Sequence, residues 1–433
     1  MNLNFEETLE KTQEYISGIF SADTTPDRES IANHVRHFLL QNSYATEETV
    51  EELSSRLMDE MQGYSILTPL LNQEDVEEIN INRWDDVKIT YTNGETIPAP
   101  QHFLSPSHAI DIVRRMLLAS NMVWDNSSCI QVGHLTGNIR VTVVGFDILD
   151  KDAALAVSIR KITASNLPRE GFVNGGTCTE NMIDFLRELY THGVSLCIAG
   201  STGSGKTTLL SYLIKNVPEH KRLITVEQGT REFDCVRRNE TGNVSNSVIH
   251  LQTRLSENEN QSVTQEKLLE TMMTMNPDYI AVGESKGAEA MQAINAANTG
   301  HAVITTTHAN GCEDVYFRLI SLCKLKYPNM DEELLTQLAV RAFPITVYIK
   351  KMEDNSRKIL QICESQYENG KVKTLPLFQF NLKKNSKDKV QGKFEQINPL
   401  SERLCNQLLE NGLDKHWLKI FANNKIKKEE KLL

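Results

Sequence analysis

Residues 200–208 read GSTGSGKTT, and the fold that this sequence predicts is decided by this stretch. It matches the phosphate-binding pattern Gly-x-x-x-x-Gly-Lys-Ser/Thr, with the apolar run VSLCIA before it and the helical pattern TLLSYLIKN at its end. Glycines let consecutive backbone N–H groups turn toward one anion, and a helix N-terminus adds a positive dipole. The residues expected to hold a nucleotide are Gly200, Ser201, Thr202, Gly203, Ser204, Gly205, Lys206, Thr207 and Thr208. Lys206 would reach the outer phosphates of ATP, and Thr207 would bind Mg²⁺.

Two further apolar runs end in a glutamate. LITVEQGTREFD ends its strand pattern at Glu227, with Glu232 and Asp234 in the following loop, and YIAVGE ends at Glu284 after Gly283. Since the carboxyl ends of parallel strands meet at the ligand in open α/β sheets, these acids are candidates for contact with a metal ion or a reacting water. A loop acid found alone is more often simply solvated. Glu227 and Glu284 are candidates for the site because the same sequence also contains a P-loop.

A fourth stretch, NTGHAVITTTHANG, contains two histidines. The strand pattern AVITTT separates His301 from His308, which places the two rings at opposite ends of a strand and argues against a shared metal. We expect His308 to hydrogen-bond the γ-phosphate or a neighbouring acid. A histidine that only caps a loop is the alternative.

The chain divides into five regions by its hydrophobic periodicity. Residues 1–62 have helical spacing, 63–162 alternate strands with one helix, 163–176 read as a polar linker, 177–349 alternate helix and strand, and 350–433 carry short strand patterns, a helix and a basic tail. The predicted fold class is α/β: a parallel-sheet P-loop domain, preceded by a small α+β domain and a helical N-terminal region.

Composition narrows the class of protein. The 433 residues are 40% hydrophobic and carry a net charge of −11, with an acidic N-terminal end and a basic C-terminal end. Direct nucleic-acid binding is not expected, because it needs one coherent basic face. No apolar stretch is long enough to span a membrane, and the start lacks the pattern of a signal peptide, so we expect a cytoplasmic protein that is at most peripheral to the cell membrane. The 8 cysteines lack the spacing of a zinc site.

Taken in order, these motifs resemble the traffic ATPases of type II and type IV secretion. NTGHAVITTTHAN is similar to that family's histidine box, ITVEQGTREFD to its aspartate box, and MNPDYIAVGESKGAEA to its atypical Walker B motif, in which Gly-Glu replaces the usual aspartate. The segment FPITVYIKKMEDNSRKILQICES resembles the branch of CpaF-type tight-adherence pilus ATPases and their conjugative relatives. The resemblance covers residues 63 to 365.

The resemblance implies a homo-hexameric ring with a RecA-like domain that binds ATP and Mg²⁺, working with inner-membrane platform or secretion-channel proteins. It assigns the catalytic carboxylate to Glu284, a metal contact through water to Glu227 and γ-phosphate sensing to His308. Lys206 and Thr207 would hold phosphate and Mg²⁺. Arg160 and Arg140 match positions from which the family's N-terminal domain supplies arginines to the nucleotide, where a fixed positive fork meets developing charge.

The sequence departs from the family pattern at several positions. Thr274 and Asn276 stand where family members often carry arginines, Lys286 replaces another, and the aspartate box reads Glu-Gln-Gly instead of Glu-Asp. These changes shift the expected arginine contact to Arg160, Arg140 or Arg254. The four-cysteine zinc insertion of the type II branch is absent from the sequence.

Three functions remain open on the sequence. The first is an ATP-hydrolysing motor for type IV secretion, conjugation or pilus assembly; the second is a nucleotide-gated assembly module with negligible hydrolysis. The third, a DNA-translocating P-loop motor, is disfavoured by the acidic N-terminal half. No residue signature identifies the cargo as pilin, protein effector or DNA.

Overall fold

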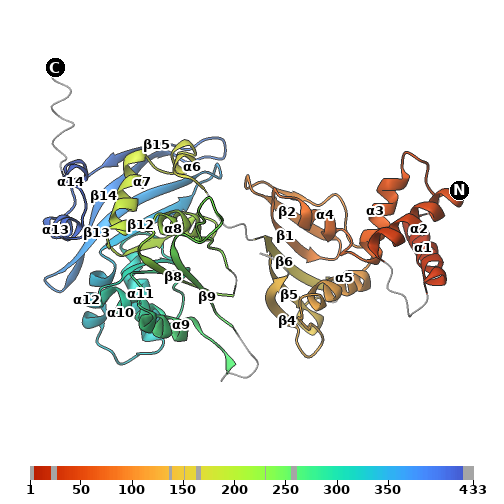
Figure 1. Ribbon diagram of the computed structural model, residues 1–433, viewed down its shortest axis with the longest axis horizontal. Helices are drawn as coiled ribbons and strands as arrows, with labels where there is room; N and C mark the ends of the chain where they lie inside the picture. Colours follow the sequence, from red (N-terminus) through yellow and green to blue (C-terminus); the bar gives the residue numbers. More distant parts are fainter. Residues whose placement is uncertain are drawn as a thin grey trace, which may run out of the picture. The chain divides into compact units, whose positions relative to one another are not determined.

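The computed structural model describes residues 4–20, 27–135, 139–150, 152–161, 167–229, 231–254 and 261–422. The chain forms two compact units, one over residues 1–162 and the other over residues 163–433 (Figure 1). Each unit has hydrophobic core clusters of its own. The expected tail at 423–433 lies outside the described residues.

The first unit opens with three helices. They are α1 (Phe5–Ile19), α2 (Arg28–Gln41) and α3 (Val50–Met61), which confirms the helical pattern read from the sequence. Apolar residues at helical spacing bury a small core that contains Val35, Leu39 and Leu57. Asp27 caps α2 by accepting a hydrogen bond from the backbone N–H of Ser30.

A mixed layer of sheet and helix follows. Its elements are α4 (Leu67–Asn72), β1 (Val76–Arg83), β2 (Asp86–Tyr91), β3 (Thr96–Pro98), α5 (Pro106–Leu118), β4 (Ile130–Leu135), β5 (Ile139–Gly145), η1 (Phe146–Ile148) and β6 (Leu155–Lys161). The antiparallel sheet has the order β3-β2-β1-β6-β5-β4. The alternate apolar residues of β1, β5 and β6 pack with α4 and α5, so the other sheet face carries the polar residues. Strand β4, which has a weaker alternation, was not singled out in the sequence.

The polar face of this sheet brings charged residues into register. Arg140 on β5 pairs with His134 on β4 and with Arg160 on β6, and Arg160 pairs in turn with Glu78 on β1. The Arg160 guanidinium lies 3.7 Å from Glu78 and 3.9 Å from Glu77. Two like charges in direct cross-strand register are unfavourable. The two arginines that the family resemblance selected are therefore neighbours on one surface.

The second unit is an α/β layer structure. Its helices are α6 (Arg169–Asn174), α7 (Glu180–Thr191), α8 (Lys206–Lys215), α9 (Gln265–Met272), η3 (Met273–Met275), α10 (Ala290–Asn298), α11 (Asp314–Lys324), α12 (Glu332–Ala342), α13 (Glu402–Glu410) and α14 (Lys415–Ala422). Its strands are β7 (Leu196–Ala199), β8 (Arg222–Glu227), β9 (Ser247–Gln252), β10 (Tyr279–Val282), β11 (Ala302–Thr307), β12 (Ile345–Lys351), β13 (Arg357–Glu368), β14 (Lys371–Lys384) and β15 (Gln391–Gln396).

The 9-stranded sheet of this unit has the order β15-β14-β13-β12-β7-β11-β10-β8-β9. Strands β12, β7, β11, β10, β8 and β9 are parallel, while β13, β14 and β15 add antiparallel pairs at one side. The four-residue runs of β7 and β10 are buried throughout, as strands covered on both faces require. The α/β class and the parallel sheet are confirmed.

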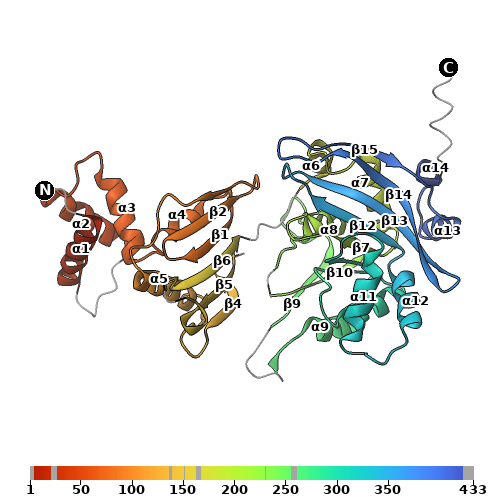
Figure 2. The same cartoon turned by 180° about the vertical axis from the view of Figure 1, so that it is seen from behind.

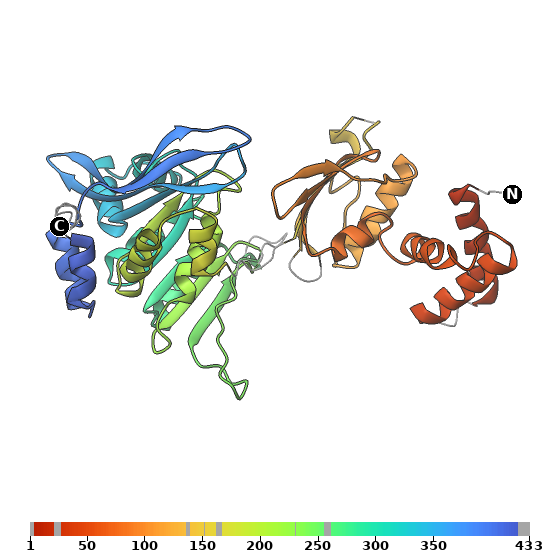
Figure 3. The ribbon, with the colours of Figure 1, turned by 90° about the horizontal axis from the view of Figure 1, so that it is seen from above.

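Helices cover both faces of the sheet. Residues of α6, α7, α8, α13 and α14 share one core cluster, and residues of α9, α10, α11 and α12 share the other. Figure 2 shows α11 and α12 in front of the sheet, and Figure 3 shows the sheet between its two helical layers. The carboxyl ends of β7, β11, β10 and β8 meet at one edge, which is the edge that positions the site.

Two regional predictions differ from the structure. Residues 169–174, expected within the linker, form α6, because Phe172 is buried in the core of the second unit. Residues 350–433 were expected to form a subdomain with short strands, but β13 and β14 are long and continue the main sheet from β12. Leu377 and Leu404 belong to the same core cluster as α7, so this region is part of the P-loop unit.

Candidate nucleotide-binding site

The P-loop joins β7 to α8. Gly203 and Gly205 have positive φ angles of 71° and 94°, which a side chain would strain. A Cβ atom on Gly200 would stand 2.2 Å from the Ile349 carbonyl oxygen, so β12 passes too close for any other residue. Helix α8 begins at Lys206, and its first-turn N–H groups point into the loop. The local geometry is that of an anion cradle.

Lys206 is buried at the base of this loop. Its Nζ donates to the carbonyl oxygens of Gly200 at 2.9 Å and Ser201 at 2.8 Å. The Ser204 Oγ is buried and has no hydrogen-bond partner among the described residues. A ligand oxygen placed in the cradle could accept a hydrogen bond from this hydroxyl. The loop therefore fits a phosphate group.

Glu284 and His308 meet at the carboxyl edge of the sheet. His308 follows β11 and Glu284 follows β10, and the parallel pairing of these strands brings the His308 Nε2 to 3.0 Å from the Glu284 Oε1. The Lys286 Nζ lies 4.0 Å from the other carboxylate oxygen. The Glu284 side chain keeps about a third of its surface exposed, so the carboxylate faces the open edge of the site. The two residues selected from separate motifs form one pair.

Backbone contacts fix the position of Glu284. The Gln265 side-chain amide donates to the Glu284 carbonyl at 2.9 Å, and the Ser285 N–H donates to the Thr306 carbonyl at 2.8 Å. The Thr306 hydroxyl donates to the Gly283 carbonyl at 2.7 Å. The polar residues of the ITTT run in β11 thus hold the loop that carries the acid. These hydrogen bonds explain why polar threonines are buried in β11.

The charges around His308 favour its neutral form. Burial lowers the pKa of His308 below its usual range, and the positive charges of Lys206, Arg318 and Lys286 act in the same direction, while Glu284 opposes them. The neutral imidazole keeps its Nε2 beside the Glu284 carboxylate, 3.0 Å from the Oε1 atom.

Glu227 lies deeper than the other acid. Its side chain is 3% exposed, and one carboxylate oxygen accepts hydrogen bonds from the backbone N–H groups of Glu232 and, at 3.0 Å, Phe233. Burial raises the pKa of Glu227 to about 7, although those two N–H groups act against the shift. Glu227 thus ties the aspartate-box loop to the end of β8. Its metal contact stays a prediction.

His250 on β9 is the buried neighbour of Glu227. Its Nδ1 lies 4.0 Å from the Glu227 Oε1, and the Thr225 hydroxyl lies 2.8 Å from that nitrogen and 3.4 Å from that oxygen. Burial lowers the pKa of His250 to about 4. The sequence alone does not identify His250, because a single histidine in SVIHLQ gives no signal until β8 and β9 are known to pair.

Arg140, Arg160, Arg254 and His301 are not among the site contacts described so far. Arg140 and Arg160 belong to the first unit and the P-loop to the second, and the contribution of both arginines stays a prediction. Arg254 forms an isolated bridge with Val263 and donates to the Gln261 carbonyl. His301 bonds the Pro277 carbonyl through its Nδ1 at 2.8 Å, at the end of β11 opposite to His308.

Two residues near the site were missed in the sequence. The Glu289 carboxylate accepts the backbone N–H groups of Lys286 and Gly287, both at 2.8 Å, and so closes the loop after Glu284. Arg318 on α11 is close enough to lower the pKa of His308. A loop capped by an acid three residues ahead is a recognisable signal for Glu289, whereas Arg318 depends on the packing of α11.

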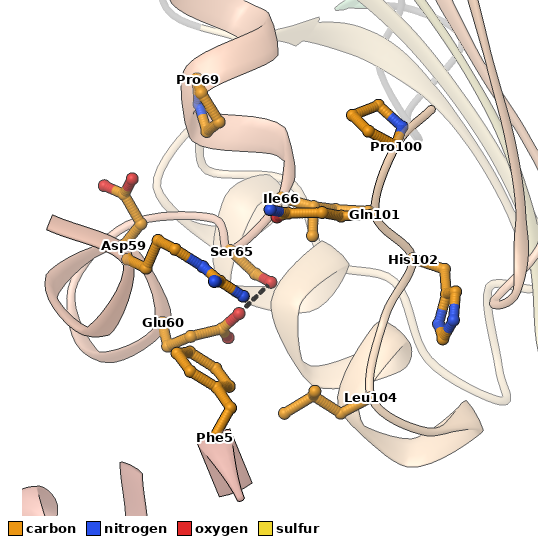
Figure 4. Close-up of a pocket in the computed structure, with 11 residues that line it drawn as sticks. Phe5, Asp59, Glu60, Ser65, Ile66, Pro69, Pro100, Gln101, His102 and Leu104 are labelled. Carbon is orange, nitrogen blue, oxygen red and sulfur yellow. Dashed lines mark hydrogen bonds between the residues drawn. The ribbon is translucent and has the colours of Figure 1, made fainter. Parts of the chain in front are cut away.

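The first unit contains a cavity of about 270 Å³ between α3, α4 and residues 100–104 (Figure 4). Its acids are already paired: Asp59 contacts Arg28 at 3.1 Å, and Glu60 contacts His108 at 2.9 Å and the Ser65 hydroxyl at 2.5 Å. The Glu60–His108 contact joins α3 to α5, and the Asp59–Arg28 contact joins α3 to α2, so these charges link the helical region to the sheet layer.

Over the part of the chain that the structure describes, no group of three or more His, Cys, Asp and Glu residues is arranged to hold a metal ion. Among the same residues, no helix is long and apolar enough to cross a membrane.

The P-loop before α8, together with an acid and a histidine at the ends of adjacent parallel strands, defines a RecA-like P-loop NTPase fold. The family model described as "Type II/IV secretion system protein" matches residues 133–372, more than half of the chain. The chain therefore belongs to the type II/IV secretion system protein family, which confirms the resemblance read from its motifs.

Individual relatives agree with this membership. The chain is 36% identical over 140 residues to the type IV secretion system protein VirB11 of Brucella suis, an alignment that covers 32% of this chain and 37% of the relative. It is 24% identical over 330 residues to a Mycobacterium tuberculosis protein whose name assigns it provisionally to conjugal transfer, covering 74% of this chain and 90% of that one. The solved structure of the ATPase DotB from Legionella pneumophila has a TM-score of 0.50 at 21% identity and covers 69% of this chain and 79% of its own.

Proposed function

We propose that this protein is an ATP-hydrolysing motor, assembled as a homo-hexamer, that powers type IV secretion, conjugation or pilus assembly from the cytoplasmic side of a membrane. The observation that carries the proposal is the 3.0 Å pair of Glu284 and His308 at the sheet edge that also carries the P-loop. The names of the relatives support the secretion context: VirB11 is a type IV secretion system protein, and the Mycobacterium relative is named for conjugal transfer.

Different residues of the chain bind the phosphates, orient the carboxylate and accept the proton. The P-loop N–H groups and Lys206 bind the phosphates, which requires the Lys206 ammonium to leave the Gly200 and Ser201 carbonyls. His308 holds the Glu284 carboxylate in one orientation, and Glu284 accepts a proton from the attacking water as it adds to the γ-phosphorus. The ADP–phosphate bond then breaks, and the electron pair stays on ADP.

Magnesium fits the oxygen donors of this edge. The Thr207 hydroxyl and the Glu284 carboxylate are the residues that would hold it, either directly or through water, together with the nucleotide's own phosphates. The ion supplies charge neutralisation on the phosphates when bound. Glu227 is less suited to direct contact, because backbone N–H groups already occupy one of its oxygens.

A second function, a nucleotide-gated assembly module with negligible hydrolysis, is favoured by one feature. Lys286 stands where an arginine is expected, and its Nζ lies 4.0 Å from Glu284, so this loop lacks the guanidinium fork that would bind the nucleotide's phosphates. The contact between Glu284 and His308, by contrast, favours the hydrolysing motor.

Phosphate release by the purified full-length chain tests the proposal. We expect ATP-dependent turnover that requires Mg²⁺, from particles whose mass by light scattering is that of a hexamer. Lys206→Ala should abolish turnover. Tight ATP binding with turnover no faster than that of Lys206→Ala would support the assembly module instead.

A further inference from the structure

The hairpin between β12 and β13 lies against the P-loop. Strand β12 runs parallel to β7 and continues beyond it, so the Ile349 carbonyl approaches Gly200 as described above. At the start of β13, the Arg357 Cγ lies 3.6 Å from the position that a Cβ atom on Gly205 would take. Gly205 is the residue before Lys206 and caps α8. The Arg357 side chain is therefore placed at the wall of the phosphate cradle.

This hairpin is held rigidly. The Met352 N–H donates to the Ser356 carbonyl at 2.8 Å, which closes the turn. The Asp354 carboxylate accepts the Ser356 N–H at 3.0 Å and the Val390 N–H at 2.9 Å, which ties the turn to the segment before β15. Two hydrogen-bonded anchors fix the backbone from which Arg357 projects. A contact made by Arg357 would thus lose little entropy on forming.

The charge of Arg357 is not neutralised by a neighbouring acid. Its guanidinium donates to the Asn355 carbonyl at 3.3 Å, and no carboxylate lies within 4.0 Å of it among the residues described. By contrast, Arg169 contacts Asp184 at 2.7 Å and Arg187 contacts Glu188 at 2.8 Å in the same unit. A partly exposed guanidinium without a carboxylate partner, on a side chain whose Cγ lies against Gly205, is available to a ligand.

The sheet order tells which end of the ligand Arg357 faces. Strands β11 and β10, which carry His308 and Glu284, lie on one side of β7, and β12 and β13 lie on the other. The γ-phosphate must lie on the side of the acid that activates water. The α-phosphate and the nucleoside therefore extend toward β12 and β13, where Arg357 is located.

We propose that Arg357 binds the nucleoside end of the nucleotide, at the α-phosphate and the adenine face, and thereby sets affinity for ATP and ADP without taking part in the chemical step. This proposal rests on the nucleotide site of the proposed function. A planar guanidinium suits the position, because it can bond a phosphate oxygen and stack on a base.

Calorimetric titration of the full chain with ADP tests this inference. We expect Arg357→Ala to weaken ADP binding by about tenfold or more, as the loss of a charge-assisted contact does. Inorganic tripolyphosphate has a phosphate in the α position but no base. Its affinity should fall by a similar factor if the phosphate contact dominates, and should stay within about twofold if the base contact dominates. At saturating ATP, kcat should stay within about twofold of the unaltered chain, while KM rises.

Arg403→Ala, which removes an exposed arginine from α13, is the matched control and should leave ADP affinity unchanged. Arg357→Lys keeps the charge and separates the two contacts: restored affinity assigns the α-phosphate, and unrestored affinity assigns the base. ADP affinity of Arg357→Ala equal to that of Arg403→Ala, with the melting temperature of the free chain preserved, would overturn the proposal. Absence of ADP binding by the unaltered chain would instead overturn the proposed function.

Discussion

The Nε2 of His308 lies 3.0 Å from the Oε1 of Glu284, although the two residues come from different motifs and follow different strands. Parallel pairing of β10 with β11 creates this contact, and the Ser285 and Thr306 backbones lock the two loops together. Any change at the γ-phosphate that moves one residue is thus transmitted to the other.

His308→Asn should lower kcat by about tenfold to a hundredfold, because a misplaced carboxylate activates water poorly. ATP affinity should change little, since the phosphates bind to the P-loop. Steady-state phosphate release and direct ATP titration measure the two effects. His301→Asn, at the start of the same strand, is the control and should keep kcat near that of the unaltered chain; equal losses in both variants would mean that strand stability was measured.

The shifted pKa values of Glu227 and His250 predict that these two groups affect the pH dependence of stability in opposite directions. In the folded chain the pKa of Glu227 is raised from 4.5 to about 7, and the pKa of His250 is lowered from 6.5 to about 4. The Glu227 shift lowers stability as pH rises from 4.5 to about 7, whereas the His250 shift raises stability from about 4 to 6.5. The opposing effects cancel over most of this window.

Single variants should reveal each effect. Glu227→Gln leaves His250, so the unfolding free energy should rise with pH, by at most about 1.4 kcal/mol per pH unit. His250→Asn leaves Glu227 and should give the opposite sign. Urea unfolding of the second unit between pH 5 and 6.5 measures both slopes. Slopes of equal sign in the two variants would contradict the arrangement.

Gly200→Ala should destabilise the second unit by roughly 1–3 kcal/mol, because its Cβ would overlap the Ile349 carbonyl oxygen. The P-loop must shift, so ATP affinity should fall as well. Gly18→Ala in α1, where a Cβ atom meets nothing within 4 Å, is the control and should be neutral or slightly stabilising. Thermal unfolding with and without ATP compares them; an unaffected Gly200→Ala chain would mean that β12 moves away easily.

Arg140→Ala should raise the stability of the first unit but lower ATP turnover. Removing one of two like charges in cross-strand register stabilises the first unit by roughly 0.2–1 kcal/mol, whereas loss of an arginine that meets the nucleotide lowers turnover. Thr142→Ala, on the same face one pair further along, is the control. Thermal unfolding and phosphate release are the measurements. Unchanged turnover in Arg140→Ala would leave Arg160 as the arginine of the first unit.

The sequence was informative where local pattern and chemistry coincide. The P-loop, the acid after β10 and the histidine after β11 each carry a strand or helix signal beside a reactive side chain, so their positions at one sheet edge followed from the parallel-sheet rule. The α/β class and the helices of residues 5–61 were predicted in the same way.

Long-range pairing was not accessible from periodicity. Residues 350–433 were read as a subdomain with short strand patterns, because the length of β13 and β14 and their place in the main sheet depend on pairing between strands, such as that of Cys363 with Thr346. His250, Glu289 and Arg318 escaped notice for the same reason: each acquires a role only through its neighbours on another strand, loop or helix. Helix α6 was likewise read as part of a linker, because the burial of Phe172 in the core of the second unit is a tertiary contact.

The role of Glu284 is tested most directly by Glu284→Gln, which preserves shape and the contact with His308 but removes the negative charge. ATP titration and phosphate release should be measured on the same preparation. We predict ATP affinity within about threefold of the unaltered chain and a fall in kcat of about a hundredfold or more. Hydrolysis at the unaltered rate in Glu284→Gln would contradict the assignment of this carboxylate as the base.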